Sequence, residues 1–442
     1  AMLYYEHQQY EREGGAGSFE PTDKTARVQD GFVAIDAVAA QGSSRLTDEL
    51  RRLGATNVET YGRLVSGRLP IERIPDIADL SGLRSARLAA MKMNDQGSVV
   101  SEGDAAMEAD SARIQADVSG QGVTVGVLSD AYNSLGGASE GIRTGDLPPA
   151  EKINVLQDLS SGIDEGRAMM ELIHDVAPQA NLAFHTAFTG QAGFAQGIKR
   201  LAGAGSDVIV DDIIYFTEPM YQDGIIAQAA DSVKEAGVPY FSSAGNAADQ
   251  SYESEFRLEG NSHDFNPDPD VVDTTQTIQV PVGASTGQIS LQWTDPFITA
   301  TEGQAGPDTD LDVQILDKEG NIVAELATNN IQTGRPVEFF GFTNPGTIDA
   351  DDDGIPDKTF QVRIVLAEGP APERAKYVYF GALDILEYDT ESASSFGHAN
   401  AAGAMAVGAA NHLRTPEFGV NPPEPEDFSA KGGVDIFFND DG

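Results

Sequence analysis

The sequence predicts a mixed α/β protein built on a doubly wound parallel sheet, with a small α+β unit before the sheet and a β-sandwich inserted in it. Between residues 122 and 242, apolar strand-like runs alternate with helix-like segments, an order that gives a parallel sheet covered by helices on both faces. Residues 32–88 follow the β-α-β-β-α-β order of a ferredoxin-like unit. Residues 255–384 show short alternating strands separated by turns, which is typical of sandwiches and jelly rolls.

These patterns divide the 442 residues into successive segments. The expected segments are a polar tail at 1–30, the ferredoxin-like unit at 31–92, the first part of the α/β domain at 93–254, the β-sandwich at 255–384 and the second part of the α/β domain at 385–442. Residues 93–118 are polar and are expected to form a linker. A tandem order, in which the sandwich simply follows the α/β domain, is the alternative.

Charge and composition exclude several classes of function. The 28 Lys and Arg residues face 70 Asp and Glu residues, which gives a formal net charge of −42. A field of this sign repels phosphate backbones and anionic lipids, so nucleic-acid and membrane partners are not expected. The chain has no cysteine, which excludes disulfides, thiolate zinc sites and cysteine nucleophiles. No apolar run approaches the roughly 20 residues of a membrane-spanning helix.

The excess of carboxylates also bears on the environment of the protein. It suits a protein that stays hydrated in concentrated salt, as in a halophilic organism, and a generally acidic secreted protein is the alternative. The first residues show no basic region followed by an apolar run, so no signal peptide is visible.

Three segments place polar groups where a parallel sheet concentrates its chemistry. Asp130 ends an apolar strand that begins near Gly122, and a helix cap or a metal ligand is the other explanation for it. Glu165 stands in the first turn of an amphipathic helix, where acids are ordinary partners of the helix dipole. Asn246 follows a strand, where an amide donates to an oxyanion or stabilises a turn.

In this order, the three segments resemble those of the subtilisin-like serine proteases, or subtilases. Gly122–Asp130 resembles the strand that carries the triad Asp of that family, and Ala244–Asn246 resembles the strand end that supplies the oxyanion Asn. Ala404–Ala409 and Phe428–Gly433 resemble two later segments of the same core. The resemblance covers about 90–254 and 386–442.

Residues 30–90 resemble, more loosely, the propeptide of the same family. The match rests on Gly54-Ala55, Gly62, Val65-Ser66-Gly67 and Leu69-Pro70. The resemblance therefore implies a secreted serine endopeptidase in zymogen form, with protein or peptide substrates, its own propeptide as intramolecular inhibitor and no organic cofactor.

The implied site departs from the family at the general base. Asp130 stands for the triad Asp and Asn246 for the oxyanion donor, but Glu165 occupies the position of the triad His. His174 lies nine positions further on, about 180° around the helix, and is not a replacement. The sedolisins, a related family, use Ser with Glu and Asp. Two adjacent carboxyl groups do not both ionise easily. Asp130 and Glu165 are therefore expected to share a proton, which raises the pKa of one of them.

The family's nucleophile motif does not occur in this sequence. Ser395 lies in a partial look-alike that precedes the Ala404–Ala409 segment, and we reject it as the nucleophile. His398, close by, is expected to be a structural or substrate-edge residue rather than a catalytic one. We therefore expect the chain to be a fragment that lacks its catalytic serine.

Two acidic segments remain. Asp211 and Asp212 end a strand where subtilases bind substrate, so they would favour basic substrate residues, or Asp212 would join the carboxyl groups near Glu165; a solvated acid pair is the alternative. In the β region, the alternating acids of one loop resemble calcium loops of dockerin and thrombospondin type repeats. The expected calcium ligands are Asp349, Asp351, Asp353 and Asp357.

The function predicted is thus peptide-bond hydrolysis through an Asp/Glu/Ser site. The alternative from another class is a catalytically dead subtilase-fold protein that acts as a calcium-dependent binding module.

Overall fold

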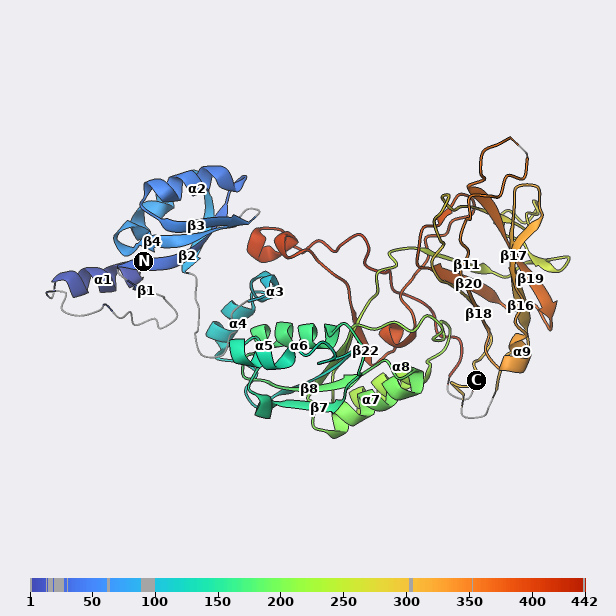
Figure 1. The fold of residues 1–442 in the computed structure, drawn as a ribbon, viewed down its shortest axis with the longest axis horizontal. Helices are drawn as coiled ribbons and strands as arrows, with labels where there is room; N and C mark the ends of the chain where they lie inside the picture. Colours follow the sequence, from blue (N-terminus) through green and yellow to red (C-terminus); the bar gives the residue numbers. More distant parts are fainter. Residues whose placement is uncertain are drawn as a thin grey trace.

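The computed structural model describes residues 2–12, 14, 19, 28–29, 31–61, 64–88, 100–301, 305–351, 353–439 and 442. Figure 1 shows three groups of elements along the long axis: the N-terminal unit, a central α/β unit and a β unit.

The central unit is a parallel sheet of six strands, so the mixed α/β class with a parallel sheet is confirmed. The strand order is β22-β10-β9-β6-β8-β7. The strands are β6 (Thr124–Ser129), β7 (Ile153–Gln157), β8 (Asn181–Thr186), β9 (Val208–Asp211), β10 (Tyr240–Ser243) and β22 (Ala404–Val407). The connecting helices are α5 (Ala138–Thr144), α6 (Glu165–Val176), α7 (Gln191–Gly203) and α8 (Ile225–Glu235), with the short 3-10 helix η2 (Ala150–Lys152) before β7.

Helices cover both faces of this sheet (Figure 1). Val127 packs in a core cluster with Met170 of α6, whereas its neighbour Leu128 packs in another cluster with Ile198 of α7 and Ile226 of α8. Successive side chains of a strand point to opposite faces, so a strand covered on both sides reads as the continuous apolar run seen before Asp130.

The residues between β10 and β22 form two antiparallel sheets that pack on a shared core. The first has the order β11-β20-β15-β18, and the second contains seven strands. The first comprises β11 (Ser251–Glu255), β15 (Ile289–Trp293), β18 (Val337–Phe340) and β20 (Arg374–Tyr379). The second comprises β12 (Leu258–Glu259), β13 (Ser262–His263), β14 (Gln276–Gln279), β16 (Asp310–Leu316), β17 (Ile322–Leu326), β19 (Thr359–Glu368) and β21 (Asp384–Ile385), and helix α9 is Asn330–Thr333.

The first of these strands starts before the expected boundary at 255. Residues Ser251–Glu255 already pair with β20, and the side chain of Tyr252 packs in the β core. The chain returns to the parallel sheet through the 3-10 helix η3 (Gly397–Asn400), and β22 then pairs with β10.

The N-terminal unit is an antiparallel sheet in which β2 lies between β4 and β5, and β3 lies beyond β4. Its strands are β1 (Val28–Gln29), β2 (Phe32–Ala39), β3 (Thr56–Tyr61), β4 (Leu64–Pro70) and β5 (Leu83–Leu88), with helix α2 (Ser43–Arg52). The segment expected to be the second helix is the 3-10 helix η1 (Ile71–Asp79), which contains Pro75. Proline removes a backbone donor and disfavours a continuous α-helix.

The segments expected to be a polar tail and a linker contain helices. Within the expected tail lies α1 (Met2–Arg12), whose Leu3, 5% exposed, joins the core of the N-terminal unit. Within the expected linker lie α3 (Glu102–Ala106) and α4 (Ala109–Ala116).

An ion pair explains why the linker segment is ordered. Arg113 of α4 pairs with Asp104 of α3, and its guanidinium also donates to the carbonyl of Val176 over 2.9 Å. A cation at the C-terminal end of α6 complements the helix dipole and satisfies an end carbonyl. The linker is thereby fixed to α6, the helix that begins at Glu165.

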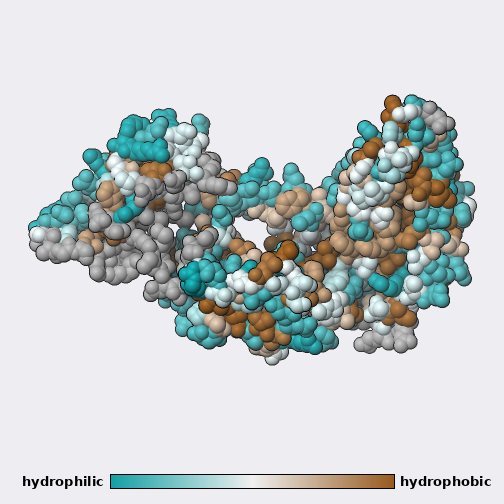
Figure 2. All heavy atoms as spheres, viewed as in Figure 1, coloured by the Kyte–Doolittle hydropathy of each residue, from teal (hydrophilic) through white to brown (hydrophobic). Residues whose placement is uncertain are grey.

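The surface follows the composition. Hydrophilic residues cover much of the face seen in Figure 2, although brown apolar groups gather over the central and β units. The 3-10 helices η4 (His412–Arg414) and η5 (Pro416–Phe418) form an excursion after β22 that packs against α3. Within the described residues, no helix combines the length and apolar character needed to cross a membrane.

Candidate active site at the carboxyl edge of the parallel sheet

The candidate residues follow three neighbouring strands. In the register of the sheet, Leu128 of β6 is level with Asp211 of β9, and Asp211 is level with Ser242 of β10. Asp130, Asp212 and Asn246 therefore all lie just beyond the carboxyl ends of β6, β9 and β10. The carboxyl edge of an open parallel sheet is where such folds place their sites.

Asp130 holds the start of α6. One carboxylate oxygen, Oδ1, accepts from the backbone N–H groups of Ala131 at 2.5 Å and Glu165 at 2.9 Å, and Oδ2 accepts from that of Ile163 at 2.6 Å. Asp130 is 5% exposed, and Gly162 permits this close approach, since a Cβ there would lie 2.7 Å from Oδ2. The carboxylate thus caps the start of α6 from the end of a neighbouring strand, as the helix-cap explanation of Asp130 expects.

The residue before Glu165 is held in an unusual conformation. Asp164 has a φ of 61°, in the left-handed region that non-glycine residues seldom adopt, and it is 2% exposed. Its carboxylate accepts from the backbone N–H of Leu135 and forms an ion pair with Arg167 at 3.2 Å. These contacts fix the backbone at the start of α6, and they therefore fix the point from which the Glu165 side chain extends.

Glu165 lies within an acidic environment. Burial of the side chain raises its pKa above the ordinary value, and the negative charges of Asp212 and then Asp130 raise it further. Asp212 is exposed. The structure therefore brings Glu165, Asp212 and Asp130 near one another, and the hydrogen bonds that the described residues offer Asp130 come from backbone N–H groups rather than from the Glu165 carboxyl group.

Asn246 lies at the same edge but two strands away from β6. It is exposed and follows Gly245, whose φ is 91° and whose carbonyl accepts from the backbone N–H of Ala430 at 2.9 Å. The segment around Ala430 therefore runs along the Asn246 loop. An exposed amide in this position is available to a ligand, and its role as an oxyanion donor stays a prediction.

Asp211 and His398 are placed differently from Asp212. Asp211 is 2% exposed, and its Oδ1 accepts from the Ser242 hydroxyl at 3.0 Å and contacts His398 Nε2 at 3.2 Å. Asp211 is therefore engaged inside the protein, and its contact with a substrate stays a prediction. Strand alternation explains the difference, since adjacent residues at a strand end point to opposite sides.

Two further residues do not join the candidate site. His174 lies on the buried side of α6 and is 3% exposed. Ser395 is 4% exposed, and its backbone N–H donates to the carbonyl of Lys431. Sequence reasoning missed Glu218, whose carboxylate holds His398 at 2.8 Å, because its loop matches no motif.

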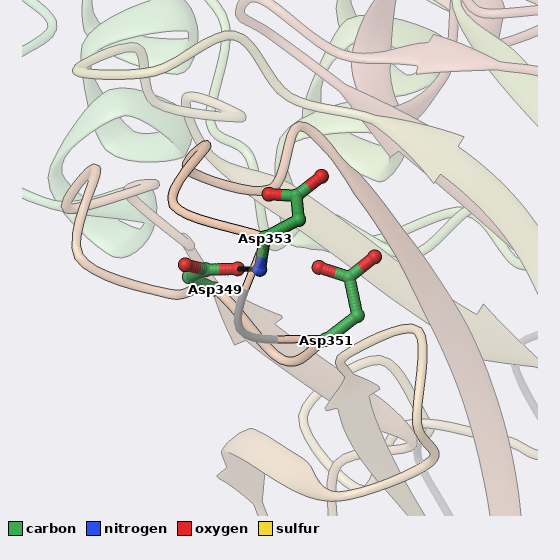
Figure 3. A group of neighbouring side chains, drawn as sticks. All are labelled: Asp349, Asp351 and Asp353. Carbon is green, nitrogen blue, oxygen red and sulfur yellow. Dashed lines mark hydrogen bonds between the residues drawn. The ribbon is translucent and has the colours of Figure 1, made fainter.

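The acidic loop of the β unit brings three of its four expected calcium ligands together. Carboxylate oxygens of Asp349, Asp351 and Asp353 lie within 4.8 Å of one another (Figure 3). The fourth, Asp357, forms an ion pair with Lys318 Nζ at 2.7 Å, and the same ammonium lies 2.6 Å from Asp351. Lys318 was not predicted from the sequence to take part. Its ammonium group competes with a cation for two of the four carboxylates.

Solved structures match parts of the chain at low identity, whereas no protein-family model and no curated protein matches it. The self-cleaved protease domain of PatA is 18% identical, with 30% of this chain and 52% of that chain covered and a TM-score of 0.22. The prenylagaramide maturation protease PagA is 14% identical, with 31% and 50% covered and a TM-score of 0.23.

A third match is fervidolysin from Fervidobacterium pennivorans, a keratinolytic enzyme related to subtilisin. It is 14% identical, with 50% of this chain and 41% of that chain covered and a TM-score of 0.20. The chain spans about half the length of these solved structures. At such low TM-scores the likenesses establish neither a family nor an activity for this chain.

Proposed function

We propose that the chain is part of a subtilisin-like serine endopeptidase in which a carboxylate replaces the usual imidazole base. The observation that carries the proposal is Glu165, a partly buried carboxyl group at the start of α6 with a raised pKa beside two other acids. A general base works best when its pKa lies near the working pH, and a raised glutamic acid approaches that condition.

Each residue then has a distinct role. The Glu165 carboxylate takes the proton of a serine hydroxyl as the serine oxygen bonds to the peptide carbonyl carbon, and it later gives that proton to the leaving amine. Asp130 fixes the start of α6 and contributes negative charge, Asp212 contributes the larger charge effect on Glu165, and the Asn246 amide donates to the oxyanion. The attacking serine belongs, in this proposal, to a segment outside these 442 residues.

The remaining parts of the prediction fit this role as proposals. The N-terminal unit would be the inhibitory propeptide, substrates would be proteins or peptides, and the protein would act outside the cell. Its acidic site edge would favour basic substrate residues near Asp212.

Replacement of the base tests the proposal. In the full-length protein, Glu165→Gln should lower the rate of peptide cleavage by about 10²–10⁴-fold while leaving the fold intact, because the amide cannot accept the serine proton. Glu171→Gln is the matched control, since Glu171 lies on the same helix away from its start. Cleavage of a fluorogenic peptide mixture by all three proteins at equal concentration provides the measurement, and unchanged cleavage by Glu165→Gln would overturn the role.

A second candidate function is calcium-dependent binding without catalysis. It is favoured by the convergence of Asp349, Asp351 and Asp353 in an exposed loop of the β unit. Experiment distinguishes the two functions. A binding module cleaves no peptide, and Glu165→Gln does not alter its binding.

A further inference from the structure

A cluster of ionisable groups lies buried behind the carboxyl edge of the sheet. His398 of η3 is 2% exposed, with Nδ1 2.8 Å from Glu218 Oε1 and Nε2 3.2 Å from Asp211 Oδ1. Glu218 is equally buried, and its second oxygen accepts from the backbone N–H of His398 at 2.9 Å. The cluster joins three segments that are far apart in the sequence: the end of β9, the loop before α8 and the turn that leads into β22.

The contacts of His398 favour its charged form. Each ring nitrogen faces a carboxyl oxygen, and an ionised carboxylate only accepts, so with both acids ionised both nitrogens donate and the ring is an imidazolium. Burial lowers the pKa of His398, but the charges of Glu218 and Asp211 outweigh burial and raise that pKa well above its usual value. Two further groups face the cluster: the Tyr240 hydroxyl, whose pKa burial raises well above its usual value, and the Phe194 ring, whose centroid lies 5.0 Å from that of the His398 ring in a T-shaped arrangement.

Asp211 links the buried His398 to the backbone at the end of β9. Its Oδ1 accepts from the backbone N–H of Ile213 at 3.1 Å as well as from the Ser242 hydroxyl. One carboxylate oxygen therefore fixes the chain on both sides of Asp212. Asp212 is the neighbour whose charge acts most strongly on Glu165.

Glu218, at the other end of the cluster, is held by the β unit. The Gln292 side chain of β15, which is fully buried, donates to the Glu218 carbonyl at 2.8 Å and accepts from the backbone N–H of Met220 at 2.8 Å. The position of His398 therefore depends on contacts with both the parallel sheet and the β unit.

We infer that His398 is a positioning residue, a buried imidazolium that holds the end of β9 so that Asp212 stays beside Glu165. It touches no substrate in this account and acts through Asp211. The inference rests on the proposed function only in that Glu165 is taken as the base; the arrangement of charges does not depend on cleavage.

The protonation of His398 is tested by NMR on the full chain labelled with ¹⁵N-histidine. Both ring nitrogens of His398 should carry protons at pH 7, above the ordinary pKa of histidine. His263 is an internal control in the same spectrum, because burial lowers its pKa to about 4 and it should stay neutral. A neutral His398 tautomer at pH 7 would overturn the inference.

The positioning role is tested by the titration of Glu165 itself, followed by its ¹³C-labelled carboxyl carbon and assigned with Glu165→Gln. In His398→Gln the midpoint should move down toward the ordinary value of a glutamic acid, because Asp212 is no longer held nearby. His412→Gln, in η4, is the matched control and should leave the midpoint unchanged. An unchanged midpoint in folded His398→Gln would contradict the role, since a merely structural histidine would alter stability alone.

If His398→Gln does not fold, Ser242→Ala decides the question. This variant removes one donor to the same oxygen of Asp211 and should move the midpoint in the same direction by a smaller amount, whereas no movement would overturn the inference. Both readouts are independent of peptide cleavage, so they can succeed where the proposed function fails, and the reverse.

Discussion

At the scale of single residues, the proton affinity of Glu165 is set by opposing effects. The start of α6 carries a partial positive charge, which favours the ionised carboxylate. Burial and the charges of Asp212 and Asp130 oppose ionisation and raise the pKa. Because the pKa is raised, the balance favours the protonated form more than in a free glutamic acid.

Asp212→Asn should therefore lower the pKa of Glu165. The base is active only when deprotonated, so the acid limb of the kcat/KM profile should shift to lower pH. Asp207→Asn is a suitable control, because Asp207 lies at the opposite end of the same strand, where it accepts from the backbone N–H of Thr124. A limb that moves equally in both variants, or in neither, would contradict the assignment.

Asp130 and Glu165 were predicted as neighbours because the strand and the helix that carry them resemble segments of the subtilases. The sequence did not predict the burial of Asp211, because that depends on His398, which lies 187 positions away and folds back only after the β unit is complete. Local sequence patterns predict where strands end and helices start, but they do not predict contacts between turns that are far apart in the sequence.

At the scale of elements, the β unit contains a second unusual acid. Glu338 of β18 is fully buried, and it accepts from the backbone N–H of Thr328 at 3.0 Å. Burial raises the pKa of Glu338 to about 7, and the charge of Asp312 adds to this effect. The folded state therefore holds a proton that the unfolded state loses between about pH 4.5 and pH 7.

This raised pKa predicts that the β unit loses stability as pH rises through that window. Glu338→Gln, which is always neutral, should gain about 1–3 kcal/mol over the natural protein between pH 5 and pH 8.5. Urea unfolding at both pH values measures this, with the fluorescence of Trp293 as reporter, since it is the single tryptophan and is fully buried in β15. Parallel pH dependence of the two proteins would refute the prediction.

The acidic loop of Figure 3 gives a prediction about calcium. Lys318 already neutralises Asp351 and Asp357, so Lys318→Gln should bind calcium about tenfold more tightly than the natural protein, as the competing ammonium is gone. Titration calorimetry measures this, and Asp349→Asn and Asp353→Asn should each weaken binding. The calcium proposal fails if neither protein shows binding that depends on Asp349 and Asp353.

Elements were predicted best where a periodic pattern was supported by a buried face. The strands and helices of the parallel sheet have such faces, and the alternation of strands and helices expected between 122 and 242 is present. Helix α1 and the helices α3 and α4 were missed because their sequences are polar overall, and their order comes from a few tertiary contacts such as the pair of Arg113 and Asp104.

At the scale of the whole molecule, the net charge of −42 is the dominant property. Like charges on one folded body repel, and salt shortens the range of that repulsion from about 10 Å at 0.1 M to about 3 Å at 1 M. We therefore expect the melting temperature to rise between 0.1 M and 2 M KCl, as in a protein adapted to salt.

Calorimetric melting curves across this series provide the measurement, with sucrose in place of KCl as the control for effects of an excluded solute. A rise with KCl that far exceeds the rise with sucrose supports charge screening. A melting temperature that does not depend on KCl would contradict it.

Covalent labelling reports whether a serine is activated next to Glu165, as the proposed function requires. The full-length protein is treated with a fluorophosphonate reagent, which modifies only activated serines, and the labelled peptide is identified by mass spectrometry. We expect one labelled serine, with labelling strongly reduced in Glu165→Gln and unchanged in Glu171→Gln. No labelling of the folded natural protein, or equal labelling in Glu165→Gln, would contradict it.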